Sequence, residues 1–440
     1  MIVSFPHPRP LRALLVSLLA CTAIATAGAT TGAQAALGGV RGSAASRYPA
    51  GATRPKITPR ASEYARSARS VRVARSKPKK TKKKAKAVLR GDPARALVAY
   101  QAMQATYYIP GSGLYEGEPF SYLWPFSQAL AATVSMSNIA HIGVSFAHEQ
   151  QVQMIGLGAY LDANNSGAPE GIYTSTSTAF DGTVAPPVGP GGTKYYDDND
   201  WVGLELARLY KLNHNPGALG DAEAIMAFEM AGWQANPELP CPGGVPFSNS
   251  AENTDRNTVT TAPAAELGVQ LYRITGNVQY LQFAEMAYEW VRSCLLQPSQ
   301  LYADHINRKG VVEPVFWSYN QGTMIGAGTL LYQVTGNGAY LYQARQTARA
   351  ALAYFTPTRL GEEIPFFPSV YFRNLLYLDS VTHDPPGPKI AQAYVDYAWQ
   401  NLRLSNDLFV AGSPASAQLL VQAAIVQIYA LLSSPPSTYF

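Results

Sequence analysis

Two adjacent aspartates, Asp197 and Asp198, lie in the densest acidic cluster of this 440-residue chain, the run 195–201. The sequence predicts that a helix begins near Trp201, with Asp200 as the N-cap residue whose side chain accepts hydrogen bonds from the first N–H groups. Asp197 and Asp198 would then precede the helix on non-helical backbone, where both carboxyls can flank one ligand. This pair is therefore the first candidate for chemistry.

Two close carboxyls are what glycoside hydrolysis with retention of configuration requires. One is the nucleophile, and the other is the proton donor about 5–5.5 Å away. Neighbouring Cα atoms, about 3.8 Å apart, can bring their carboxyls to that separation. Repulsion raises the pKa of one carboxyl and keeps it protonated, while a helix N-terminus favours the ionised partner. An Asp-rich helix cap or a calcium-binding loop would contain the same residues, and the cluster alone leaves these alternatives open.

The sequence lacks the motifs of several other enzyme classes. It contains no G-x-x-x-x-G-K-[ST] phosphate loop, no H-E-x-x-H zinc motif and no G-x-S-x-G nucleophile turn. Its six histidines and three cysteines show no zinc-site spacing. Carboxylates remain the best candidates, and neither a metal nor a cofactor is expected.

Aromatic residues support a sugar ligand. The chain has 27 Tyr against 15 Phe, and clusters such as Tyr195-Tyr196 and Trp317-Ser318-Tyr319 fall at predicted borders between loops and helices. Tyr and Trp offer an apolar ring face and a polar edge, as a sugar requires. The second cluster is followed directly by Asn320-Gln321, whose amides can bind hydroxyl groups.

The elements that would position these residues repeat along the chain. The segments 209–213, 271–277 and 331–337 share one pattern, and their tyrosines are 62 and 60 residues apart. Gly276 suits the left-handed residue that ends a helix, and Asn277 is placed to cap the next one. Each unit therefore reads as a pair of helices.

Helical pairs of this kind must stack to bury their apolar faces. The segment 93–440 is long enough for about six pairs of the repeat length. We therefore predict an all-α fold, an (α/α)6 barrel of six helical hairpins, with a cleft walled by the loops at one end.

The first 35 residues predict a secretory signal. Arg9 and Arg12 precede a short apolar run and a series of small residues, and cleavage is expected near Ala35. An alternative is a lipoprotein signal, in which Cys21 would be acylated. Either signal places the mature protein in a secreted or cell-surface location.

Residues 36–92 are predicted to be a disordered basic linker. Segment 41–90 has 17 Lys/Arg and one acid, whereas 91–440 has 15 bases and 28 acids, a net charge of −13. The basic segment suits an anionic cell-wall or membrane surface, or it is a plain spacer. Nucleic acid is not an expected partner, because the folded part is acidic.

Cys241 and Cys294 would both leave the cytoplasm with the mature chain. They could pair in an oxidising compartment, but sequence spacing does not fix the distance between their Cα atoms. A disulfide and two free thiols are both compatible with the sequence.

Four motifs together resemble glycoside hydrolase family 76, the endo-acting α-1,6-mannanases with an (α/α)6 barrel. Residues 196–201 resemble its Tyr-Asp-Asp-Asn-x-Trp signature, and Ser318–Gly322 resembles its Tyr-Asn-Gln-Gly motif. The segments 124–129 and 241–245 are similar to its opening helix and glycine-rich turn. The resemblance covers most of the predicted folded part.

That resemblance implies roles for individual residues. Asp197 would be the nucleophile and Asp198 the general acid/base. The implied substrate-binding residues are Tyr196, Trp201, Asn257, Asp304, Tyr319, Asn320 and Gln321. The chain departs from the family pattern at Pro246-Phe247, at Thr261 and at Pro368-Ser369.

The resulting expectation is a secreted glycoside hydrolase that cleaves α-1,6-linked mannan, a mannose-containing polysaccharide. Two alternatives are a mannan transglycosidase and a catalytically silent mannan-binding surface protein. Nothing in the sequence indicates an obligate protein partner, so a monomer is expected.

Overall fold

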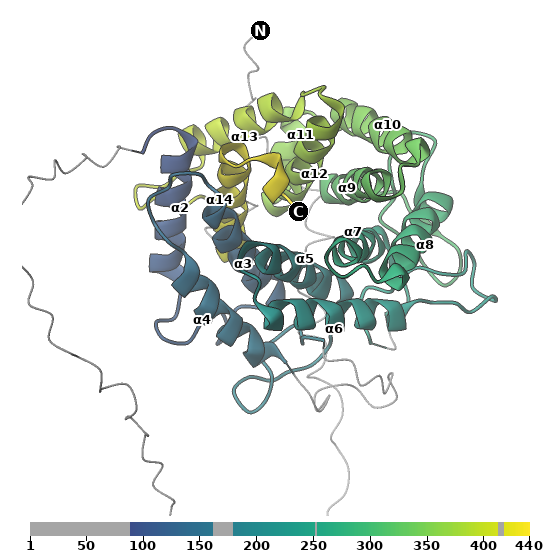
Figure 1. Cartoon of the computed structure of the whole chain (residues 1–440), viewed down its shortest axis with the longest axis horizontal. Helices are drawn as coiled ribbons and strands as arrows, with labels where there is room; N and C mark the ends of the chain where they lie inside the picture. The colour runs from purple at the N-terminus through teal and green to yellow at the C-terminus, as the bar shows by residue number, and fades with distance from the viewer. Residues whose placement is uncertain (1–88, 162–178, 251–252, 412–417) are drawn as a thin grey trace, which may run out of the picture. The chain divides into compact units, whose positions relative to one another are not determined.

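Helices carry nearly all the regular structure in the computed structural model, which describes residues 89–161, 179–250, 253–411 and 418–440 (Figure 1). The predicted signal, Cys21 and nearly all of the predicted linker lie outside the described residues. Within the described part, no helix combines the length and the apolar character needed to cross a membrane.

Six largely buried helices form a closed inner ring, each packed against the next and the last against the first. In ring order they are α3 (Leu123–Ser137), α5 (Tyr196–Asn213), α7 (Thr258–Thr275), α9 (Ser318–Thr335), α12 (Phe366–Thr382) and α14 (Leu419–Ser433).

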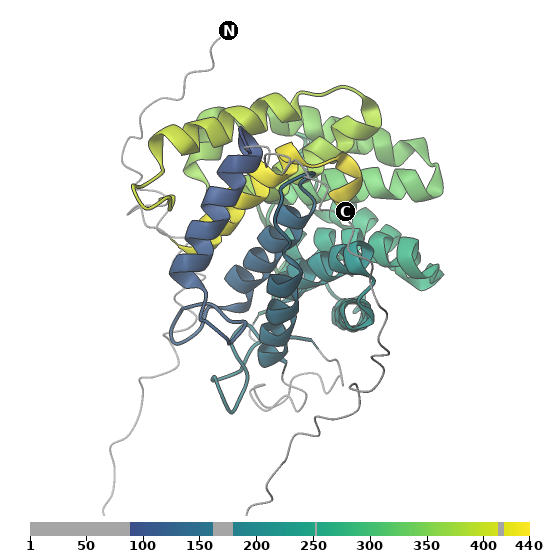
Figure 2. The ribbon, with the colours of Figure 1, turned by 60° about the vertical axis from the view of Figure 1, so that its left-hand side comes forward.

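A second layer of six helices surrounds this ring and packs against it, with α13 in contact with both α12 and α14 (Figure 1). They are α4 (Ala147–Leu157), α6 (Pro216–Gly232), α8 (Val278–Leu295), α10 (Gly338–Tyr354), α13 (Gly387–Asn401) and α2 (Asp92–Tyr107). The predicted (α/α)6 barrel is therefore confirmed. Five of its pairs are hairpins, but the sixth joins the two ends of the domain, because α2 packs on α14 (Figure 2).

The repeated Gly-Asn pair forms the inner-to-outer turns as predicted. Gly276 and Gly336 end α7 and α9 with φ of 74° and 71°. Asn277 then accepts a hydrogen bond from the Gln279 N–H at 3.1 Å and so caps α8. In the first repeat His214, with φ 55°, takes the place of the glycine.

Short elements complete the structure. A small antiparallel sheet, β1 (Arg256–Asn257), β2 (His305–Ile306) and β3 (Val312–Glu313), lies beside the start of α7. The others are α11 (Pro357–Glu362), η1 (Gly158–Tyr160) and η2 (Pro436–Thr438). Cys241 and Cys294 form a disulfide with Cα atoms 6.1 Å apart, which resolves the alternative that the sequence left open.

A buried ionic cluster crosses the inside of the ring. The Glu205 carboxylate of α5 accepts hydrogen bonds from Arg208 at 2.5 Å and from Arg373 of α12 at 2.6 Å. Arg373 also donates to Gln427 of α14, and Arg208 donates to Ser135 of α3. Four of the six inner helices are therefore joined through one cluster.

Candidate active site

The first turn of α5 contains both catalytic candidates. The helix begins at Tyr196 and has Tyr195 as its N-cap residue, so Asp197 and Asp198 are its second and third residues. The predicted start near Trp201 and the predicted non-helical backbone at the pair are therefore wrong.

Asp200 is correspondingly one turn inside the helix and fully buried, so its predicted role as N-cap is also wrong. The physical reason is a tertiary contact. The Tyr196 N–H donates to the Phe247 carbonyl at 3.1 Å, and Tyr195 forms a β-bridge with Ser248. Backbone of a distant loop thus satisfies the helix start, and no Asp side chain is needed there.

Adjacent helical residues point about 100° apart around the axis. Asp197 and Asp198 therefore leave α5 in different directions, yet each remains close enough to influence the other electrostatically. Asp197 is partly exposed and Asp198 is nearly fully buried. Oδ1 of Asp197 is itself buried, so the exposed part of this residue is not that oxygen.

The two carboxyls differ in proton affinity. Burial raises the pKa of Asp197 to about 7, backbone N–H groups of residues 197 and 198 lower it, and the charge of Asp304 raises it. Burial raises the pKa of Asp198 well above its usual range, and the charge of Asp197 adds to the effect. The negative charge of Asp197 thus favours the protonated form of Asp198.

The small sheet brings two further candidates to this site. Asn257 in β1 pairs with His305 in β2, and Asp304 directly precedes β2. The Thr258 N–H donates to the Asp304 carbonyl at 2.9 Å, which holds the start of α7 against this strand. Asp304 and Asn257, 47 positions apart in the chain, are thus neighbours in space.

Asn320 in the first turn of α9 joins the same group. Its Nδ2 donates to Asp304 Oδ1 at 3.3 Å. The buried Oδ1 atoms of Asp197, Asn257 and Asn320 have no hydrogen-bond partner within the described protein. All three are acceptors, so a ligand rich in O–H donors would satisfy them.

Aromatic rings pack where the inner helices begin. Phe366 is at the centre: Trp124 and Trp201 pack edge-on against it at 5.2 and 5.4 Å, and Tyr319 lies at 6.2 Å. Tyr319 also packs on Phe367 at 4.1 Å. Trp201 and Tyr319 are buried, so they expose little ring surface to a sugar. The main role of this cluster is to join α3, α5, α9 and α12.

Two of the predicted substrate-binding residues, Tyr196 and Gln321, have structural contacts. The ring of Tyr196 stacks on Phe228 of α6, with centroids 4.1 Å apart. Both polar atoms of the Gln321 amide are hydrogen-bonded. The oxygen accepts from the Tyr302 N–H at 2.8 Å, and the nitrogen donates to the Tyr302 carbonyl at 2.9 Å. Both residues hold the framework of the site.

Three buried carboxyls lie near the pair; sequence reasoning missed Glu229 and Glu266 and assigned Asp200 to the helix cap. Asp200 in α5, Glu229 in α6 and Glu266 in α7 are almost completely buried, and oxygen atoms of each have no partner within the described residues. Burial raises the pKa of all three well above the usual range. The sequence contained one indication that Glu266 is buried, because it lies between the apolar residues Ala265 and Leu267.

Asn199, the fourth residue of α5, was also missed although it lies inside the signature. Its side chain accepts from the Phe180 N–H at 2.8 Å and donates to the carbonyls of Phe180 and Tyr195. It therefore ties the preceding loop to the helix start. The buried ion pair between Lys194 and Asp181 supports the same loop.

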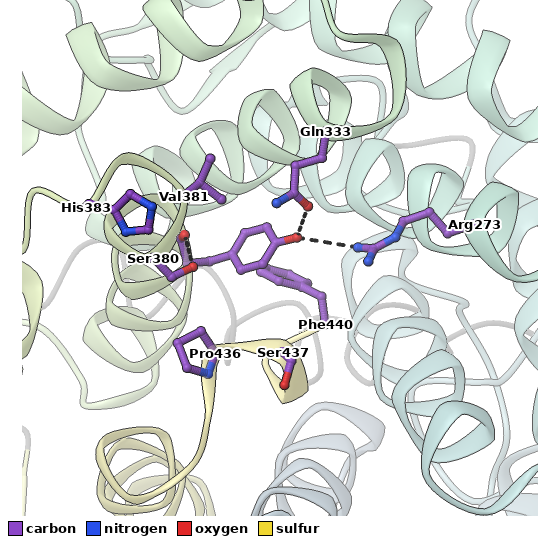
Figure 3. Close-up of a pocket in the computed structure, with 9 residues that line it drawn as sticks. Arg273, Gln333, Ser380, Val381, His383, Pro436, Ser437 and Phe440 are labelled. Atoms are coloured by element: carbon purple, nitrogen blue, oxygen red, sulfur yellow. Dashed lines mark hydrogen bonds between the residues drawn. The ribbon is translucent and has the colours of Figure 1, made fainter.

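A separate cavity of about 450 Å³ lies at the other end of the inner helices (Figure 3). Arg273 and Gln333 from the last turns of α7 and α9 line it, with His383 at the end of α12 and Phe440. Its lining, as known from the described residues, contains no carboxylate side chain. It is distinct from the Asp197 site.

The described residues contain no group of three or more His, Cys, Asp or Glu side chains arranged to hold a metal ion. The site itself offers carboxyl groups of unequal proton affinity and amide oxygens. Carboxyl groups of this kind can transfer protons and act as nucleophiles.

The fold and the site define a class: an (α/α)6 barrel with a carboxyl pair where the inner helices begin. The sequence profile of glycosyl hydrolase family 76 matches residues 94–369. The chain belongs to this family, which confirms the resemblance inferred from the motifs.

Curated relatives are similar over part of their length. A mannan endo-1,6-alpha-mannosidase of Saccharomyces cerevisiae is 24% identical over 184 residues, which are 38% of this chain and 40% of that protein. One of Candida albicans is 24% identical over 48% of this chain and 53% of its own. The chain thus spans about half or less of the relatives it matches.

Solved structures share the fold. A family 76 mannosidase of Bacteroides thetaiotaomicron has a TM-score of 0.68 at 20% identity and covers 78% of this chain and 98% of its own. An inactive double Asp-to-Asn variant of an α-1,6-mannanase of Salegentibacter, in complex with α-1,6-mannotriose, has a TM-score of 0.62 at 20% identity. It covers 78% of this chain and 99% of its own.

Proposed function

We propose that this protein is a secreted endo-acting glycosidase that cleaves α-1,6-linked mannan with retention of configuration. The observation that carries the proposal is the placement of two adjacent carboxyls in the first turn of α5, where burial raises both pKa values and the charge of Asp197 favours the protonated form of Asp198. A retaining mechanism needs one ionised and one protonated carboxyl at the same pH. The unpartnered oxygens of Asn257 and Asn320 suit a ligand with many hydroxyls.

In the first step the Asp197 carboxylate attacks the anomeric carbon and forms a glycosyl ester. The bond from that carbon to the bridging oxygen breaks, and Asp198 donates its proton to this leaving oxygen. In the second step the ionised Asp198 takes a proton from water, and the water oxygen displaces Asp197 from the sugar. Both carboxyls return to their starting states.

The family and its relatives support the substrate class. The matching yeast proteins are named as mannan endo-1,6-alpha-mannosidases, and the Salegentibacter protein binds α-1,6-mannotriose. That Salegentibacter variant is inactive and carries changes at two consecutive aspartates. Export is supported by the predicted signal in residues 1–35 and by the Cys241–Cys294 disulfide, a bond typical of oxidising compartments.

The proposal is tested with the Asp197→Asn protein and α-1,6-mannooligosaccharides. We expect turnover to fall by about 10³-fold or more with the fold retained, because the nucleophile is lost. Asp384→Asn, which changes an exposed aspartate, should leave turnover unchanged. Near-normal activity of Asp197→Asn would remove this residue from the role.

Chromatography and NMR of the products decide the remaining alternatives. Shorter oligosaccharides, released first as the α-anomer, support retaining hydrolysis. Longer oligosaccharides would indicate a transglycosidase, in which a sugar hydroxyl replaces water. Binding of intact mannan without any product would indicate a catalytically silent protein.

A further inference from the structure

A histidine in the small sheet connects the site to two carboxylates that the proposed mechanism does not use. His305 in β2 places Nδ1 2.8 Å from Asp304 Oδ2 and Nε2 3.5 Å from Asp255 Oδ2. The other oxygen of Asp304 accepts from Asn320 Nδ2 at 3.3 Å. A continuous series of contacts therefore runs from Asp255 through His305 and Asp304 to Asn320.

The register of the small sheet brings His305 close to these carboxylates. Residue 305 is in the central strand, where it pairs with Asn257 of β1 and with Glu313 of β3. Asp255 directly precedes β1, and Asp304 directly precedes β2. A carboxylate therefore lies on each side of the imidazole.

Three carboxylates face His305. The hydrogen bond to Asp304 raises the pKa of His305 above its ordinary value of 6.5, burial lowers it, and the charges of Asp304, Asp255 and Glu313 raise it. Arg256 directly follows Asp255 in the chain, but its guanidinium donates to other groups, the carbonyls of Pro240, Cys241 and Gly243. In its protonated form the imidazole is therefore a cation placed directly against Asp304.

Asp304 carries this effect towards the catalytic pair, because its charge raises the pKa of Asp197. A cation in contact with Asp304 offsets part of that charge as felt at Asp197. Removing the cation would leave the Asp304 charge fully effective. The proton of His305 and the ionisation of Asp197 are thus linked through one side chain.

We propose that His305 is a positioning residue of the Asp197 site. In its protonated form it bridges Asp255 and Asp304, holds the Asp304 carboxylate towards Asn320, and offsets the effect of that negative charge on Asp197. This inference rests on the proposed function, since it assigns His305 a part in the same reaction.

The kinetic test compares His305→Asn with His305→Lys in the full-length protein, using the pH dependence of kcat/KM. In His305→Asn the charge is lost, so the acidic limb should move to higher pH by about half a unit. His305→Lys retains a cation and should keep the limb near its original position. Arg308→Gln, which removes an exposed cation from the same hairpin, should not move it.

A purely structural histidine would give another result. His305→Asn would then lower kcat at every pH or lower the melting temperature, with the acidic limb unmoved. That outcome would overturn the inference.

An NMR titration of the imidazole signals tests the pairing without reference to turnover. The His305 signals, assigned by their loss in His305→Asn, should titrate above pH 6.5 in the wild type. They should titrate lower in Asp255→Asn, a change at a partly exposed residue that spares the fold. Titration of His305 at or below its ordinary value would overturn the inference, whereas failure of the proposed function would instead be seen as normal turnover of Asp197→Asn.

Discussion

Asp197 and Asp198 are chemically identical neighbours with different surroundings. Backbone N–H groups at the start of α5 favour the ionised form of Asp197, and burial together with the charge of Asp197 favours the protonated form of Asp198. In the proposed mechanism, a one-residue difference in helical position therefore separates the nucleophile from the proton donor. The different surroundings of the two carboxyls, and not the distance between them, account for this difference.

The pH profile follows from this difference. We expect kcat/KM to rise with pH through about 7, as Asp197 loses its proton, and to fall at higher pH as Asp198 loses its own. Activity on an α-1,6-mannooligosaccharide across the pH range measures both limbs. An acidic limb near the ordinary pKa of aspartate, about 4, would contradict the effect of burial on Asp197.

Asn199 offers a second prediction at this scale. Asn199→Ala removes the partners of the Phe180 N–H and carbonyl, which lie in a buried position. We expect a loss of about 2–3 kcal/mol in the free energy of unfolding and reduced turnover, because the loop before Asp197 is released. Urea denaturation measures the first effect. Asn401→Ala, at an exposed site, is the matched control and should cost far less.

At the scale of elements, the inner helices position the site by starting at one end of the ring. α5, α7 and α9 bring Asp197, Asn257 and Asn320 together there, although the residues are more than a hundred positions apart at the extremes. Glu363 supports α9 by accepting from the Ser318 N–H at 2.9 Å. A carboxylate from the segment after α11 thus caps a helix that has no cap of its own.

The ionic cluster inside the ring should be sensitive to loss of its anion. Glu205→Gln would leave Arg208 and Arg373 buried without a counter-charge, so we expect a loss of about 3–5 kcal/mol in unfolding free energy. Arg95→Ala removes the partly exposed ion pair between α2 and Asp396 and should cost at most about 1 kcal/mol. Chemical denaturation of both variants tests the contrast. Equal losses would contradict it.

Two residues that depart from the family pattern, Thr261 and Phe247, have contacts that support the site. Thr261 accepts from the Val245 N–H at 3.0 Å, and Thr260 donates to the Val245 carbonyl at 2.7 Å. Phe247 supplies the carbonyl that satisfies the start of α5. These residues build the wall of the site through backbone contacts.

At the scale of the whole molecule, the barrel buries several carboxyls whose pKa values are raised, including Asp200, Glu229 and Glu266. A raised pKa means that the folded state binds more protons than the unfolded state between the two pKa values. The stabilisation is complete below the unfolded pKa, and it is lost as pH rises through the folded one. Glu205 acts in the opposite sense, because despite its burial the charges of Arg208 and Arg373 lower its pKa.

We therefore expect the melting temperature to fall as the pH rises above about 4, the ordinary pKa of a carboxyl group. Glu229→Gln should make the melting temperature depend less on pH. The amide is neutral at every pH, so its burial adds no free-energy cost that grows as the pH rises. Glu238→Gln, at an exposed position, should retain the wild-type slope. Calorimetry at several pH values measures both, and a slope unchanged in Glu229→Gln would contradict the prediction.

The helical fold could be predicted because its signals are local. The Gly-Asn pair at 276–277 ends one helix and caps the next through contacts within a few residues, and the apolar spacing of α8 is visible in the chain. Helix starts that depend on distant backbone could not be predicted. The start of α5 is one, since its first N–H is satisfied by Phe247, 51 positions away.

The chain's own residue pattern determined the paired helices, their number and the identity of the acidic pair, because helical periodicity, caps and adjacent aspartates are properties of neighbouring residues. Only the tertiary structure decided which candidates meet. It brought Asp304, His305 and Asn320 to Asp197 and committed Tyr196 and Gln321 to packing and backbone contacts. It also made the two aspartates unequal, since burial and the charges of distant residues exist only after the ring has closed.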